Sequence, residues 1–283
     1  MFCKSLSCTS LLLTVLVSST SAASFDVAIY TEAHPWPQDR ADQEIAVLTD
    51  AIQGKVNPEM FDAGNLDALA DWVQAHTSGQ NHILMLTGIL PTTIYPAGNA
   101  QEDGSPVEDF LDAGNIIINT GEYTFYTIEG KQEANESFAL QNIIDVPEAY
   151  VWQGRGDNWR EEPVVMTPTA DGKKYTPSLT EYGTSYPFHP EDFEGTPWEL
   201  ELALAENTQE DRRVDPGVIV NTETGGRLGI FVQAYVLDIP APDVSWGAVI
   251  SEYILNYYIS EVAAVEPSGK LTSTWGNVKH QKY

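Results

Sequence analysis

The feature that most limits the possible folds of this chain is a regular alternation of apolar runs and amphipathic stretches over residues 25–119. Three apolar runs have strand length, at 25–30, 82–87 and 115–119, and a short further run is indicated near Met60. Helical spacing of apolar residues fills the intervals, as in Ala41, Ile45, Leu48 and Ile52. Strand–helix alternation predicts an open, mainly parallel sheet with right-handed crossovers and helices on both faces.

Residues 105–114 carry the clearest helix signals. Ser105, Pro106 and Glu108 occupy the N-cap, the first helical position and the third helical position of a capping box. Gly114 is expected to end this helix in a left-handed conformation. The same reasoning predicts N-caps for two earlier helices, Asp39 and Asn65.

The segment 146–216 differs because it is rich in proline, glycine and aromatic residues and shows few periodic patterns. It is interpreted as an irregular, aromatic-rich insertion, with short strands that give weak signals as the alternative. Regular patterns return with a late β-hairpin, whose strands 218–220 and 228–232 flank a Gly-Gly turn. Apolar and aromatic residues at helical spacing from Trp246 predict a final helix packed in the core.

The first 23 residues predict a secretory signal peptide. Lys4 precedes the apolar run 11–17, and the small residues Ser21 and Ala23 suit cleavage before residue 24. Both cysteines of the chain lie in this segment, so its removal leaves no disulfide to stabilise the fold. The expected organisation is a secreted or periplasmic protein with a signal peptide (1–23), a single α/β domain (24–265) and a C-terminal extension (266–283).

The chain is strongly acidic, with 41 Asp and Glu against 14 Lys and Arg and a net charge of −27. Nucleic acids and anionic membrane surfaces bind clustered basic residues, so both are excluded as partners. Membrane insertion is not predicted, because no apolar run after the signal approaches the ~20 residues of a spanning helix. No cofactor is predicted, and Gly154-x-Gly156 does not open a helix as a dinucleotide site would. The oligomeric state is left open.

Three short motifs resemble one known superfamily. They are Asn119–Tyr123 after a buried strand, Gly226–Phe231 in the hairpin, and Trp246-Gly247 at the start of the last helix. Their order over roughly residues 25–262 resembles the class I glutamine amidotransferase-like superfamily and, within it, the ThuA-like (trehalose-utilisation) branch. The resemblance implies a flavodoxin-like sheet. In the true amidotransferases a cysteine occupies the turn where this chain has Glu122, so glutaminase activity is excluded, because a carboxylate is a poor substitute for a thiolate.

Ligands of open α/β sheets bind beyond the carboxyl ends of the strands, and this rule selects the candidate site. Aromatic faces beside carboxylates and amides are typical of sugar binding, because rings stack on C–H faces while polar groups bond to hydroxyls. A small-molecule or carbohydrate ligand is therefore the expected partner. The expected ligand-binding residues are Trp36, Thr120, Gly121, Tyr123, Trp152, Arg155 and Gln233.

Glu32 and Glu122 form a candidate acid–base pair for processing a glycosidic bond, with His34 beside them. Ordinary polar loop residues are the alternative, since sequence does not give the separation of the two carboxylates. No metal is predicted, because neither Glu32-x-His34 nor the segment 189–192 has a second histidine at ligand spacing. The prediction is a carbohydrate-like ligand bound, and on the acid–base interpretation processed, at the carboxyl end of the sheet. The alternative is a non-catalytic protein-interaction module on the same fold.

Overall fold

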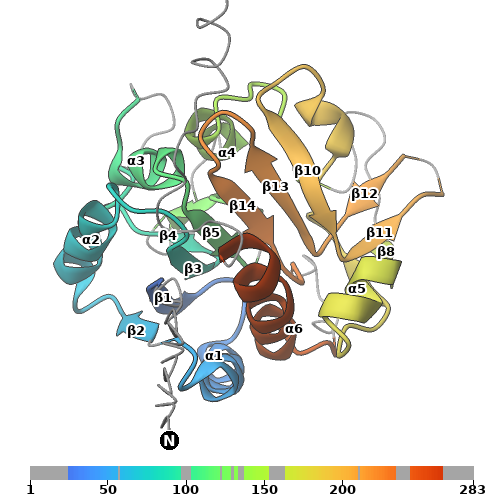
Figure 1. The fold of residues 1–283 in the computed structure, drawn as a ribbon, viewed down its shortest axis with the longest axis horizontal. Helices are drawn as coiled ribbons and strands as arrows, with labels where there is room; N and C mark the ends of the chain where they lie inside the picture. The colour runs from blue at the N-terminus through green and yellow to red at the C-terminus, as the bar shows by residue number, and fades with distance from the viewer. Residues whose placement is uncertain are drawn as a thin grey trace, which may run out of the picture.

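Seven strands form the central sheet of this chain in the computed structural model (Figure 1). In chain order they are β1 (Val27–Ala33), β2 (Pro58–Phe61), β3 (Ile83–Thr87), β5 (Ile116–Asn119), β10 (Trp198–Ala203), β13 (Gly217–Asn221) and β14 (Arg227–Ile230). The structure describes residues 25–56, 58–96, 103–121, 123–128, 131–132, 137–152, 163–209, 211–233 and 243–263. The predicted signal peptide and C-terminal extension lie outside these residues.

The strands follow the order β10-β13-β14-β5-β3-β1-β2. The pairs β1–β2, β1–β3, β3–β5 and β5–β14 are parallel, whereas β13 pairs antiparallel with both β14 and β10. The five parallel strands therefore follow the flavodoxin-like order 2-1-3-4-5, in which the chain reverses direction across the sheet between β1 and β3. The open, mainly parallel sheet and the late hairpin β13–β14 confirm the predicted fold class.

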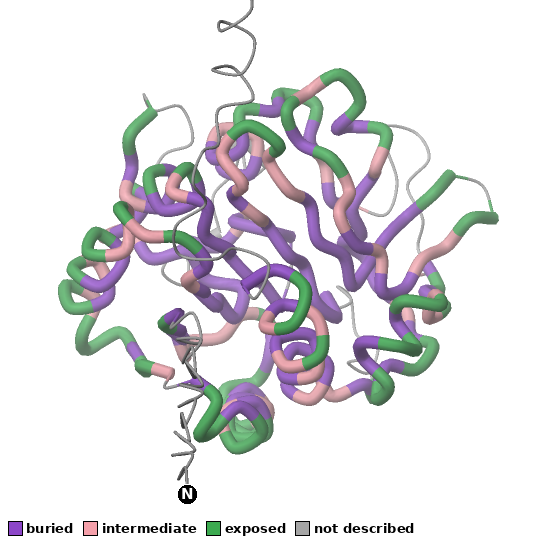
Figure 2. The backbone as a smooth tube through the Cα atoms, viewed as in Figure 1, coloured by how far each residue is buried: buried purple, intermediate pink, exposed green. Residues whose placement is uncertain are grey.

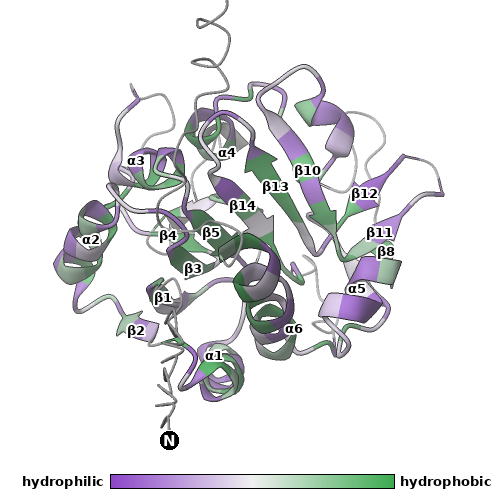
Figure 3. Ribbon diagram, in the orientation of Figure 1, coloured by the Kyte–Doolittle hydropathy of each residue, from purple (hydrophilic) through white to green (hydrophobic). Residues whose placement is uncertain are grey.

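Helices cover both faces of this sheet. On one face lie α1 (Gln38–Ile52), α6 (Trp246–Tyr253) and the π-helix that continues α6 (Ile254–Ala263), and on the other lie α2 (Leu66–Ala75), α3 (Pro106–Asp112) and α4 (Ser137–Ile143). Side chains along a strand alternate between the two cores, so Val27 and Ile29 pack under α1 while Ala28 and Tyr30 pack under α2. Burial on both faces explains why the inner strands are almost continuously apolar (Figures 2 and 3).

The helix ends agree only in part with the sequence signals. The capping box of α3 is confirmed, since the Ser105 hydroxyl accepts from the Glu108 N–H and the Glu108 carboxylate accepts from the Ser105 N–H. Gly114 adopts φ 86°, as predicted. The prediction of Asp39 as N-cap was wrong: the N-cap is Pro37, two residues earlier, because the Gln38 side chain already bonds to the end of β1. Asn65 is the N-cap of α2, but its side chain bonds back to the Asp62 N–H.

The aromatic-rich segment 146–216 contains more regular structure than its sequence indicates. It supplies the edge strand β10 and a four-stranded sheet in the order β12-β11-β8-β9. Most of these strands have five residues or fewer and give weak patterns, whereas β10 alternates Trp-Glu-Leu-Glu-Leu-Ala, a strand signal that the prediction of an irregular segment missed. The further elements are β8 (Val164–Pro168), α5 (Ala170–Tyr175), β9 (Tyr182–Thr184), a 3-10 turn (Pro190–Phe193), β11 (Ala205–Asn207) and β12 (Arg213–Val214).

A small third sheet joins β4 (Ile89–Leu90), β6 (Thr127–Ile128) and β7 (Lys131–Gln132), and it follows the carboxyl ends of β3 and β5. None of the helices in the described part of the chain is long and apolar enough to cross a membrane.

Candidate functional site

The loops that follow β1, β3 and β5 meet at one point beyond the carboxyl end of the sheet. The His34 N–H donates to the Thr87 carbonyl at 3.0 Å, which lays the loop after β1 over the end of β3. The His34 carbonyl oxygen then faces Gly88 and Gly121, whose backbones have φ 90° and 133°. A Cβ at Gly121 would stand 2.5 Å from that oxygen, and one at Gly88 would overlap it. Only glycine permits this close approach of three loops.

The end of β14 extends the same edge. Gln233 is fully buried, and its side-chain amide donates to the Asn119 carbonyl at 3.1 Å. The Thr120 hydroxyl lies 3.5 Å from the Val232 carbonyl. Of the residues predicted for the site, His34, Thr120, Gly121 and Gln233 are therefore brought together.

Next to Gly121 begins a cluster of aromatic rings, which we call the aromatic cluster: Tyr123, Tyr126, Tyr150, Trp152 and Tyr186. The Tyr123 ring is at its centre, with ring centroids 6.0 Å from Tyr126, 6.1 Å from Tyr150, 6.3 Å from Trp152 and 5.9 Å from Tyr186. Trp152 and Tyr186 are 5.1 Å apart. Tyr123 and Tyr186 are buried, whereas Tyr126, Tyr150 and Trp152 are half-buried.

Buried His189 fixes two members of the aromatic cluster. Its Nε2 lies 2.6 Å from the Trp152 carbonyl oxygen, and its ring meets Tyr150 edge-on at 5.5 Å. Since Nε2 is the donor to that carbonyl, the neutral ring carries its lone pair on Nδ1. His189 thus holds the backbone at Trp152 and packs against the Tyr150 ring. The sequence missed this role because His189 stands in the segment that shows no periodic pattern.

His189, Glu191 and Asp192 also place three metal-ligand atoms near one another. Arg213 forms an ion pair with the Glu191 carboxylate of this group, in which its Nη1 donates to Glu191 Oε1 at 2.9 Å. A guanidinium in that position repels a metal ion. The group is therefore better explained as a hydrogen-bonded support for the aromatic cluster than as a metal centre.

The remaining predicted residues are not brought into this arrangement. The Glu32 carboxylate accepts from the Ala63 N–H at 3.2 Å, which directs it to the loop after β2. Trp36 is 3% exposed and packs in the core beneath α1, with the Arg40 guanidinium 4.7 Å from its ring centre. Glu122 and Arg155 lie outside the described residues, so their predicted roles, and the Glu32–Glu122 pair, stay predictions.

A buried carboxylate that the sequence did not single out lies beside Gln233. Asp215 is fully buried, and its Oδ2 accepts from the Gln233 N–H at 3.0 Å. Burial raises the pKa of Asp215 to about 6, against the opposing effect of hydrogen bonds from Thr184, the Gln233 backbone and Tyr182. Within the described part of the chain, its Oδ1 has no hydrogen bond of standard geometry, nor does Gln233 Oε1. A carboxyl group with a pKa near neutrality is typical of functional sites.

Two bulky residues at this end have a left-handed backbone. Val232 has φ 50° and Phe125 has φ 66°, which is rare for side chains of this size. Val232 lies between the end of β14 and Gln233. Phe125 lies two residues after Tyr123, in the loop between β5 and β6. Such conformations cost on the order of 1–3 kcal/mol each and concentrate at ligand sites and switch regions.

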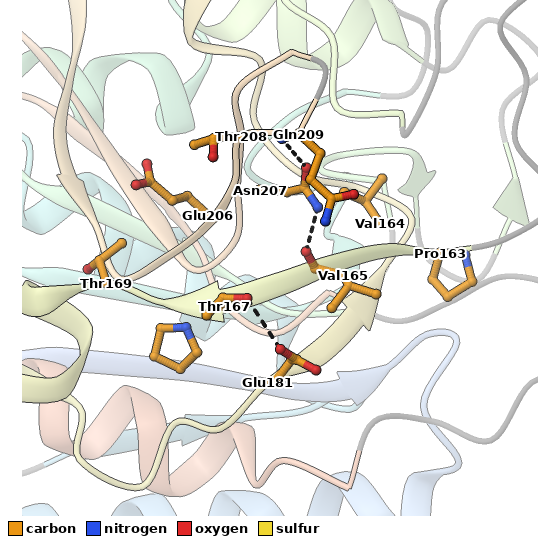
Figure 4. Close-up of a pocket in the computed structure, with 11 residues that line it drawn as sticks. Pro163, Val164, Val165, Thr167, Thr169, Glu181, Glu206, Asn207, Thr208 and Gln209 are labelled. Atoms are coloured by element: carbon orange, nitrogen blue, oxygen red, sulfur yellow. Dashed lines mark hydrogen bonds between the residues drawn. The ribbon is translucent and has the colours of Figure 1, made fainter.

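A wide groove of about 880 Å³ lies elsewhere, on the four-stranded sheet (Figure 4). It runs between β8 and β11 and is mostly polar. Glu181 accepts from the Thr167 hydroxyl on one side, and Asn207 donates to the Val165 carbonyl on the other. None of the predicted site residues lines it. The groove is lined by side chains of the four-stranded sheet and its loops, and none of them is aromatic. It therefore suits a carbohydrate ligand less well than the aromatic cluster does.

Comparison with known proteins gives little further information. No family model matches the sequence, and no curated protein matches it. One similar solved structure is a protein described as ThuA-like from Bacteroides uniformis ATCC 8492, with a TM-score of 0.45 and 9% sequence identity, covering 87% of this chain and 95% of that one. A likeness at this level supports no conclusion about family or activity, so the ThuA-like resemblance stays a prediction and the fold assignment rests on the sheet topology.

Proposed function

We propose that this chain binds a carbohydrate-like, polyhydroxylated ligand at the carboxyl end of its central sheet. The observation that carries the proposal is the aromatic cluster, in which the half-buried rings of Tyr126, Tyr150 and Trp152 surround Tyr123. Sugars expose C–H faces that stack on such rings. The cluster begins next to Gly121, at the edge of the sheet where open α/β folds bind their ligands.

A buried polar group at the end of β14 suits a hydroxyl of such a ligand. Gln233 carries an amide oxygen that accepts no hydrogen bond of standard geometry from the described residues. Buried acceptors of this kind cost free energy unless a donor reaches them, and a hydroxyl is such a donor. Export of the protein, inferred from residues 1–23, belongs to the same proposal, because carbohydrates are common ligands outside the cell.

A protein-interaction module remains the alternative, and the surface favours it less. Such a module needs a contiguous exposed apolar patch. The exposed large hydrophobic residues in the described ranges are Val47, Met60 and Val165, which belong to α1, β2 and β8. Three side chains on three separate elements do not form the core of a protein interface.

Trp152→Ala is expected to weaken carbohydrate binding about tenfold or more, because truncating an aromatic anchor typically costs over ~1 kcal/mol and 1.4 kcal/mol is tenfold in Kd. The measurement is calorimetric titration of the purified chain with a panel of neutral di- and oligosaccharides. Tyr257→Ala is the matched control, since Tyr257 is also half-buried but lies on the π-helix that follows α6. Equal affinity in all three proteins, or no binding by the unaltered chain, would refute the proposal.

A further inference from the structure

Three side chains from distant parts of the sequence converge at the opposite end of the sheet. Asp26 precedes β1, His82 precedes β3, and His76 is the C-cap residue of α2. Asp26 Oδ2 lies 3.1 Å from His76 Nε2 and 3.6 Å from His82 Nδ1. The ligand atoms of all three groups lie within 4.8 Å of one another. This group is more than a surface acidic patch, because both imidazoles are largely shielded, with side chains 17% and 13% exposed.

Backbone contacts fix which ring nitrogen of each histidine carries a lone pair. His76 Nδ1 lies 2.6 Å from the Trp72 carbonyl oxygen, so this nitrogen is the donor and Nε2 of the neutral ring is left with the lone pair. The Asp26 N–H donates to His82 Nδ1 at 3.1 Å, so the lone pair of the neutral His82 ring is on Nδ1. The His76 lone pair therefore faces the Asp26 carboxylate, whereas an ion that binds His82 Nδ1 must replace the hydrogen bond from the Asp26 N–H.

When the His76 ring is neutral, its Nε2 and Asp26 Oδ2 are two acceptors 3.1 Å apart with no proton between them, and a cation beside both removes their repulsion. Donation of the second ring nitrogen to a backbone carbonyl, as His76 makes to Trp72, is also the usual support of a metal-binding histidine. We propose that Asp26, His76 and His82 bind a divalent transition-metal ion such as Zn²⁺. This site is separate from the carbohydrate site and does not depend on it.

The separations suit a tetrahedral ion. Zinc bonds to imidazole nitrogen and carboxylate oxygen are about 2.0–2.2 Å long, which places two ligand atoms of a tetrahedron about 3.3–3.6 Å apart. The distances of 3.1 and 3.6 Å from Asp26 Oδ2 lie close to that range. Two imidazoles and one carboxylate favour zinc over the harder ions Mg²⁺ and Ca²⁺, which take oxygen ligands. Asp26 is 54% exposed, which leaves an entry path and room for a water as fourth ligand.

The scaffold around the site is rigid. Asn115, fully buried, donates to the carbonyls of His76 and Phe110 and accepts from the His82 N–H, each at 2.9 Å. One side chain thus ties the C-terminus of α2 to the loop that carries His82. The His76 ring stacks on Trp72 at 4.0 Å and meets the His82 ring at 4.3 Å, which limits the rotation of both imidazoles. Ligands held in this way lose little entropy on binding an ion.

The test is calorimetric titration of the metal-stripped full chain with Zn²⁺, together with thermal unfolding at the same ion concentrations. We expect one Zn²⁺ per chain and a rise in Tm that grows with zinc concentration, because an ion that binds only the folded state stabilises it. His76→Gln, His82→Gln and Asp26→Asn are each expected to weaken binding at least ~10-fold.

Asp67→Asn is the control for net charge, because Asp67 is an exposed acid in the first turn of α2 and lies outside the cluster. It is expected to bind zinc as the unaltered chain does. Two results would overturn the proposal. One is the absence of stoichiometric binding, which would leave an ordinary polar contact between His76 and Asp26. The other is equal weakening by Asp67→Asn and His76→Gln, which would show diffuse attraction to an acidic surface.

Discussion

Gly88→Ala is expected to lower the free energy of unfolding by about 2–5 kcal/mol. The backbone of Gly88 has φ 90°, and a left-handed conformation costs a non-glycine residue about 1–2 kcal/mol. The added Cβ would also overlap the His34 carbonyl oxygen, and relieving such a clash typically costs a further ~1–3 kcal/mol. Urea unfolding followed by fluorescence measures the change.

Gly54→Ala is the matched control for this variant. Gly54 has φ 77°, but nothing lies within 4 Å of the Cβ position, so the control carries the backbone cost without the clash. We expect it to lose only about 1–2 kcal/mol. If the two variants were equally stable, the loops after β1 and β3 would not meet as described, and the geometry of the site would be wrong.

The second large effect concerns the pH dependence that Asp215 gives to stability. Its pKa is about 6 in the folded chain against an ordinary value of 3.8, so between these values the folded state holds a proton that the unfolded state has lost. The contribution of this group to stability is therefore fully present below pH 3.8 and is lost as pH rises through 6. A shift of about two pH units corresponds to about 3 kcal/mol.

Asp215→Asn removes this titration, so the difference in unfolding free energy between the unaltered chain and the variant is expected to fall by about 2.4 kcal/mol from pH 4 to pH 7. Urea titrations at several pH values measure it, at low protein concentration because the isoelectric point is about 4.2. Asp67→Asn, an exposed acid in α2, serves as the control and is expected to show a nearly constant difference. A constant difference for Asp215→Asn as well would show that this carboxyl is not buried as described.

Local signals in the sequence predicted the parts of the fold that depend on neighbouring residues. The capping box of Ser105 and Glu108 and the left-handed Gly114 follow from a few adjacent positions, and the structure confirms them. The parallel sheet follows from long, buried strands that alternate with helices. Asp39 is not the N-cap because Gln38, the first residue of α1, bonds to Thr31 of β1 and so starts the helix earlier, and this contact leaves no capping signal in the sequence.

The sequence predicts where a site would lie, and its use by a ligand stays a prediction. The rule for open sheets points to the ends of β3 and β5, where the structure brings His34, Thr120 and Gly121 together. Asp215 and His189 were missed because their burial arises from short strands that leave no periodic pattern. Asp26, His76 and His82 are separated by up to 56 positions, so no spacing motif relates them, and only the folded chain brings them together.

The central claim is that the ligand binds beside the aromatic cluster, and its location can be measured directly. A crystal structure of the protein with the tightest-binding saccharide from the titration panel is expected to show a sugar ring stacked on Trp152 or Tyr150, next to Thr120 and Gly121. A saccharide found instead in the groove between β8 and β11, or at any place remote from Tyr123, would contradict the claim.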